Sequence, residues 1–84
     1  MQMIEEKDRA VTGEHYYPAL DEALAVFLRR EGMTQEEFAR SVMGMAPNTF
    51  SWKRRGVREF TLSEATVLAD ALGMSLPALI GAAA

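Results

Sequence analysis

Apolar side chains recur at helical spacing along most of the chain, and glycines separate the runs. Between residues 19 and 30, four of them fall on one face of a 3.6-residue period: Leu20, Leu24, Phe27 and Leu28. Pro18 precedes this run and Gly32 follows it, and both residue types are common at helix boundaries. The pattern predicts a first helix that buries its leucine face.

A capping box opens a second helix, because Thr34 and Glu37 can each satisfy a free backbone N–H of the first turn. The inward face of this helix consists of Phe38, Ala39 and Val42. Gly44 follows the last turn, where a positive φ is needed, so we expect the helix to stop there.

Pro47 suits the first turn of a third helix, since the N–H that proline lacks would have been unpaired at that position. On this helix Phe50 is the single large apolar residue placed to anchor inward, and Gly56 ends the run. The polar and basic residues around Phe50 are therefore expected on the outer and flanking faces of the helix.

A second capping box, Thr61 with Glu64, opens a fourth helix with the apolar stripe Leu62, Ala65, Leu68, Ala69 and Leu72. Ser75 caps a short fifth helix. We therefore predict an all-α, compact five-helix domain over residues 18–82. Residues 1–17 show no sustained period and are expected to form a flexible, partly disordered N-terminal arm.

The composition narrows the class of protein. The chain has 84 residues, 49% of them hydrophobic and 25% charged, as expected for one small soluble domain. It has no cysteine and one histidine, and no carboxylates cluster near that histidine, so we expect no enzyme activity, no metal and no cofactor. With neither a secretory signal nor an apolar run long enough to span a bilayer, a cytoplasmic location is expected.

Charge is distributed unevenly along the chain. The formal net charge is -3, yet residues 29–60 hold seven basic and four acidic side chains. Five bases and no acid lie between Arg40 and Arg58. Screening confines each charge to roughly 8 Å at physiological salt, so a basic patch can attract phosphate on an acidic molecule. Lys53, Arg54 and Arg55 can also be read as a solvated helix end favoured by the helix dipole.

Residues 20–80 resemble the Cro/cI-type, or XRE-like, helix-turn-helix domains of phage and bacterial transcriptional regulators. Several spacings carry the resemblance: Thr34-Gln35 at a helix start, Ala39 one turn later, Gly44 in the turn, Phe50 six residues after it, Gly56 twelve after it, and Leu-x-x-Ala-x-x-Leu-Ala-x-Ala-Leu-Gly over 62–73. The resemblance implies a lambda-repressor-like fold whose third helix enters the DNA major groove.

The chain departs from the family pattern at three points. Gly44 comes five positions after Ala39 where the family normally has four, which predicts a bulge at the end of the second helix or a longer turn. Trp52 stands one position before the family's common tryptophan, so it either faces DNA or packs on the core. Ala46 replaces the usual Ser or Thr cap, at a cost of about 1 kcal/mol.

The third helix carries the side chains that we expect to contact DNA. The base-contact candidates are Asn48, Thr49, Ser51 and Trp52, because an asparagine amide can bond adenine bidentately, hydroxyls can bond base edges, and methyl or ring carbons can meet thymine methyls. The phosphate-contact candidates are Arg40, Lys53, Arg54, Arg55 and Arg58, together with Gln35, whose role the resemblance implies. For Arg40 an ion pair with Glu36 or Glu37 is the alternative.

Useful specificity normally requires two half-sites, so we expect a homodimer on a pseudo-palindromic operator. The candidate interface residues are Leu76, Leu79 and Ile80, which could alternatively close the core. The predicted function is a double-stranded DNA-binding transcriptional regulator that represses by occluding its operator. The alternative is a protein-binding module, such as an antitoxin or an anti-repressor partner, that uses its N-terminal arm or fifth helix.

Overall fold

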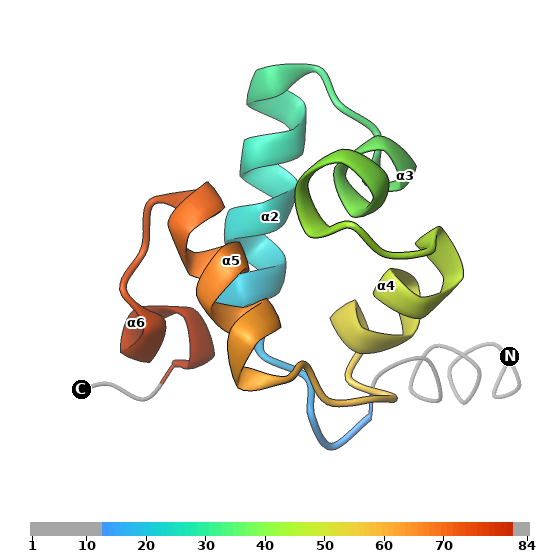
Figure 1. Ribbon diagram of the computed structural model, residues 1–84. Coiled ribbons are helices and arrows are strands. Elements are labelled where there is room, and N and C mark those ends of the chain that lie inside the picture. Colours follow the sequence, from blue (N-terminus) through green and yellow to red (C-terminus); the bar gives the residue numbers. More distant parts are fainter. Residues whose placement is uncertain (1–12, 82–84) are drawn as a thin grey trace, which may run out of the picture.

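The computed structural model describes residues 13–81, and this part of the chain contains five α-helices and no strand (Figure 1). The helices are α2 (Pro18–Glu31), α3 (Gln35–Phe38), α4 (Pro47–Arg54), α5 (Leu62–Leu72) and α6 (Leu76–Ile80). Helices α4 and α6 lie on opposite sides of the molecule, with α2 and α5 between them (Figure 1). The predicted all-helical class is confirmed.

The boundaries follow the capping signals. The hydroxyls of Thr34 and Thr61 each accept a hydrogen bond from the backbone N–H three residues on. The carboxylates of Glu37 and Glu64 in turn accept from the backbone N–H of the cap residue. The Ser75 hydroxyl caps α6 in the same way through the N–H of Ala78. Both predicted capping boxes and the serine cap are confirmed.

A π-helical turn, η1 (Ala39–Met43), continues directly from α3. The Ala39 carbonyl accepts hydrogen bonds from the N–H groups of both Gly44 and Met45. Gly44 then ends the helix at φ 66°, in the left-handed region that glycine adopts without strain. This bulge within the helix is one of the two outcomes that the spacing of Ala39 and Gly44 predicted.

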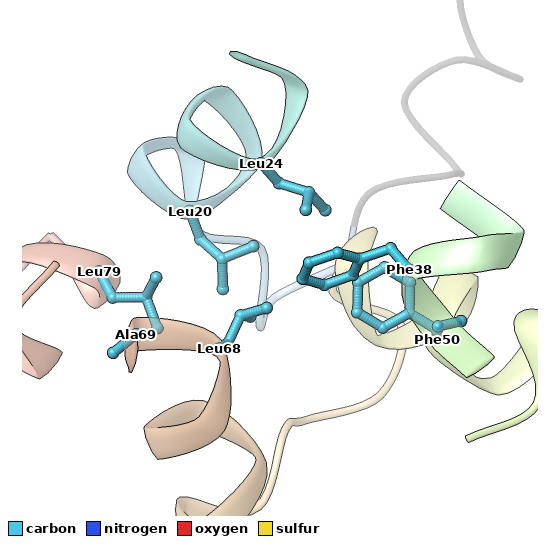
Figure 2. Packing of buried hydrophobic residues seen from close by; sticks show 8 residues of the cluster. Leu20, Leu24, Phe38, Phe50, Leu68, Ala69 and Leu79 are labelled. Carbon is cyan, nitrogen blue, oxygen red and sulfur yellow. The ribbon is translucent and has the colours of Figure 1, made fainter. Parts of the chain in front are cut away.

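The core is built from one or two residues of each helix. Figure 2 shows the rings of Phe38 and Phe50 side by side, with leucines of α2, α5 and α6 across the interior from them. All four phenylalanines of the chain join in a row of aromatic contacts, with ring centroids 5.6 to 6.0 Å apart: Phe27–Phe38, Phe38–Phe50 and Phe50–Phe60. Phe50 in this row fastens α4 to the rest of the domain.

Residues 13–17 pack against the loop that follows α4. The N–H of Gly13 donates to the Arg55 carbonyl at 2.8 Å, and that of His15 donates to the Gly56 carbonyl at 3.2 Å. Gly56 is buried with φ 82°, and its α-carbon faces the backbone of Tyr16. The folded body therefore begins before Pro18, and the last part of the predicted arm belongs to it. Residues 1–12 of that arm, and residue 82, lie outside the described residues.

Candidate nucleic-acid interface

The N-terminal half of α4 presents polar side chains to solvent. Phe50 is fully buried, as predicted, and this orientation leaves Asn48 exposed and Thr49 and Ser51 half-buried on the flanks. Ala46 provides no side-chain cap. An amide and two hydroxyls thus lie within the first five residues of a two-turn helix, whose start has no side-chain cap from residues 13–81.

Trp52 lies at the surface and supports an arginine. Its side chain is 38% exposed, and the guanidinium carbon of exposed Arg58 lies 4.7 Å from the ring centroid. The N–H groups of Val57 and Arg58 both donate to the Trp52 carbonyl, which folds the loop back over the end of α4. Of the two predicted positions, at the surface or packed on the core, Trp52 therefore lies at the surface, and a cation lies over its ring.

Arg54 is bonded inside the protein. Its Nε donates to Asp21 Oδ1 at 2.5 Å, and its Nη1 donates to Gln35 Oε1 at 2.6 Å. The Tyr16 hydroxyl donates to the other Asp21 oxygen at 3.2 Å, and burial together with the Asp21 charge raises the pKa of Tyr16. The phenol therefore stays protonated as a donor. Two predicted phosphate contacts, Arg54 and Gln35, are thus brought into contact with each other.

Lys53 is also paired within the fold. Its Nζ donates to Glu64 Oε1 at 2.6 Å, and the same oxygen accepts the capping hydrogen bond from the Thr61 N–H. Burial opposes ionisation of Glu64, but the hydrogen bonds from Lys53 and Thr61 outweigh it and lower the pKa of Glu64. Lys53 therefore connects the C-terminal turn of α4 to the first turn of α5.

We expect Glu64→Gln to remove part of the acid sensitivity of folding. A glutamate in the unfolded chain has a pKa of about 4.3, so the charged form stabilises the fold fully above that value. The stabilisation is then lost as the pH falls through the lowered pKa of the folded state. Thermal unfolding between about pH 7 and pH 3 measures this loss. The matched change Glu37→Gln, at an exposed capping box, should leave more of the pH dependence in place.

The remaining predicted phosphate contacts are spread over two regions. Arg55 follows α4 and is half-buried, and its Nε is buried without a hydrogen-bond partner in the described part of the chain. Arg40 is exposed on η1, where it lines an open groove with Glu36, Glu37 and Met33. Arg55 and Arg58 therefore share the end of α4, whereas Arg40 lies on the neighbouring element.

The three predicted interface residues of α6 have different environments. Leu79 is fully buried in the core, Leu76 is half-buried, and Ile80 is 39% exposed. Leu79 thus closes the core of a single subunit and offers no side-chain surface to a second one. Ile80 is the member of the set that faces solvent.

The sequence reasoning missed the acidic partners of the basic residues. Glu64 was predicted only as the partner of Thr61 in a capping box, and Asp21 lies in the first turn of α2, where the helix dipole favours an acidic residue. A missed signal was present: Lys53 and Arg54 have no acidic neighbour between Arg40 and Arg58, so any carboxylate partner must come from another helix.

Comparisons with protein-family models, with curated proteins and with solved structures gave no match. Within residues 13–81, the apolar stretches of the helices are too short to cross a bilayer. The functional assignment therefore depends on the geometry of α4 and of the residues around it.

Proposed function

We propose that this protein is a sequence-specific double-stranded DNA-binding regulator, in which α3, η1 and α4 act as a helix-turn-helix. The observation that carries the proposal is the N-terminal half of α4, where Asn48 is exposed between half-buried Thr49 and Ser51 while Phe50 is fully buried. A helix fits a major groove about 12 Å wide, and its N-terminal residues then meet the base edges. Repression by occluding the operator is the simplest mechanism for so small a domain.

Base selection is assigned to the exposed face of α4. Asn48 can donate from its amide nitrogen and accept at its amide oxygen, which matches the N7 acceptor and N6 donor of adenine. Thr49 offers a hydroxyl and a methyl group, and Ser51 offers a hydroxyl. Trp52, at 38% exposure, has ring area to cover a sugar or a thymine methyl.

Phosphate binding is assigned mainly to the three predicted basic contacts that lack a carboxylate partner within residues 13–81: Arg40, Arg55 and Arg58. Lys53 and Arg54 each face a carboxylate, so their charges are offset within the fold. Three neutralised phosphates predict a slope of log K against log salt of about -2.7 per half-site. Gln35 adds an uncharged phosphate contact.

Selection from random duplexes, followed by two variants, tests the proposal. Asn48→Ala should abolish the preference at one base pair, worth about 1–3 kcal/mol, because the bidentate contact is lost. Arg58→Ala should weaken binding to all duplexes alike and reduce the magnitude of the salt slope by about 0.9, because one phosphate contact is lost. Titration by fluorescence anisotropy at several salt concentrations measures both effects.

The same selection tests the proposed homodimer. Two subunits would return a pseudo-palindrome with half-sites about one helical turn apart, whereas a monomer would return a single half-site. Equal affinity for every duplex would contradict sequence-specific regulation and favour the protein-binding alternative. In that case the N-terminal arm or α6 would serve a protein partner.

A further inference from the structure

Arg54 is held by acceptors on two other helices. Besides the bonds from Nε to Asp21 Oδ1 and from Nη1 to Gln35 Oε1, its Nη2 lies 3.5 Å from the Asp21 carbonyl oxygen. All three guanidinium nitrogens are thus directed at protein acceptors, and the side chain is only 18% exposed. A planar guanidinium with five donors can make this three-way connection, whereas an ammonium group cannot make it in one plane.

The charge of Arg54 is already balanced. One carboxylate oxygen of Asp21 contacts the Arg54 guanidinium, and the other accepts from the Tyr16 hydroxyl. Both oxygens of this carboxylate are therefore hydrogen-bonded. A phosphate that took Arg54 would leave the carboxylate half-buried without its cation. Direct binding of DNA by Arg54 would therefore forfeit a pair that joins α4 to α2.

The contact with Arg54 also determines which way the Gln35 amide faces. Arginine has donors and no acceptor, so only the amide oxygen of Gln35 can face it. The Gln35 nitrogen, with its two N–H donors, is consequently turned away from Arg54, on a side chain that is half-exposed at the start of α3. Without this contact the amide could rotate and present its oxygen, which a phosphate would repel.

We propose that Arg54 is a positioning residue rather than a phosphate ligand: anchored by Asp21, it orients the Gln35 amide so that its N–H donors meet a DNA phosphate. This inference rests on the proposed function, because the phosphate belongs to bound DNA. It reassigns Arg54, which charge alone placed on the DNA backbone. Gln35 becomes the contact, and Arg54 acts through it.

Gln35→Glu separates binding from folding. The carboxylate accepts from Arg54 at least as well as the amide oxygen, so the thermal midpoint should stay the same or rise. The N–H donors are lost and a negative charge is added, so affinity for the selected duplex should fall about ten-fold or more. Val26→Glu, at an exposed position of α2 on the side that faces Leu72 of α5, is the control for one added negative charge and should change affinity by much less.

The double variant Asp21→Asn with Arg54→Gln tests the role of Arg54. It replaces an ion pair by two neutral side chains, so the net charge of the protein is unchanged. If Arg54 is a positioning residue, the double variant should bind DNA more weakly. Its slope of log K against log salt should equal that of the unmodified protein, because no phosphate-neutralising charge is removed. A direct phosphate contact predicts a slope reduced in magnitude by about 0.9. That reduction would overturn the inference.

The outcomes distinguish this inference from the proposed function. If the unmodified protein binds a selected duplex but Gln35→Glu binds it equally well, the inference is wrong and the proposed function stands. If the unmodified protein has no duplex preference, both fail. The anchoring has its own measurement in the free protein: the Arg54 Nε–H and Gln35 amide signals in NMR spectra should be ordered, and Asp21→Asn should loosen both.

Discussion

Replacing Phe50 with alanine is expected to abolish the cooperative folding of the domain. The ring is fully buried and lies between Phe38 and Phe60, at centroid distances of 5.6 and 6.0 Å. Removing a buried phenylalanine costs about 3–5 kcal/mol, which is comparable to the whole stability of a small domain. Circular dichroism should show a broad thermal transition or none, and DNA binding should be lost with it.

Trp52→Ala is the matched control, since it removes a larger aromatic side chain two residues further along α4. Trp52 is 38% exposed and carries Arg58 over its ring at the surface, whereas Phe50 is fully buried, so the loss of Trp52 should leave no enclosed cavity and cost less. The cooperative transition should therefore persist with a modest shift. A Phe50→Ala variant as stable as Trp52→Ala would show that α4 is held by something other than this ring.

Replacing Gly56 with alanine should produce the second large loss of stability. A β-carbon at this buried position would overlap the backbone nitrogen and α-carbon of Tyr16, and φ 82° is unfavourable for any L side chain. The left-handed conformation alone costs roughly 1–2 kcal/mol, and the overlap adds the cost of separating residues 13–17 from the loop. Urea unfolding would measure the midpoint, and proteolysis should cut first before Pro18.

Gly44→Ala gives the comparison that isolates the overlap. Gly44 has φ 66°, but among residues 13–81, apart from Gly44 and its chain neighbours, no atom lies within 4 Å of a β-carbon built there. It should therefore show the conformational cost alone. Equal losses for the two variants would mean that the packing of residues 13–17 on the loop contributes nothing to stability.

The helices were predictable because their signals are local. Thr61 and Glu64 lie three residues apart, and the capping box depends on no other part of the chain. The burial of Phe50 was predicted because it is the large apolar residue placed to anchor this short polar helix inward. The bulge between Ala39 and Gly44 was one of two outcomes predicted by comparing the spacing of these two residues with the Cro/cI-type pattern that the sequence resembles.

The partners of the basic residues were not predictable in the same way. Arg54 and Asp21 are 33 positions apart, and their contact depends on how α2 and α4 cross. Residue type predicts that a buried arginine needs an acceptor, but it does not say which one. For the same reason Leu79, one of three apolar residues on a short helix, could not be assigned to core or surface before α6 was placed.

The two ends of α4 are held differently. At its C-terminal turn Lys53 joins α5 and Arg54 joins α2 and α3, whereas the other end begins at uncapped Ala46 and is secured by Phe50. Exposed positions in that first half, Asn48 above all, carry none of these connections. Point mutations can therefore change the exposed side chains of this helix during evolution without altering the contacts that hold it in place. Protein engineering could use the same positions.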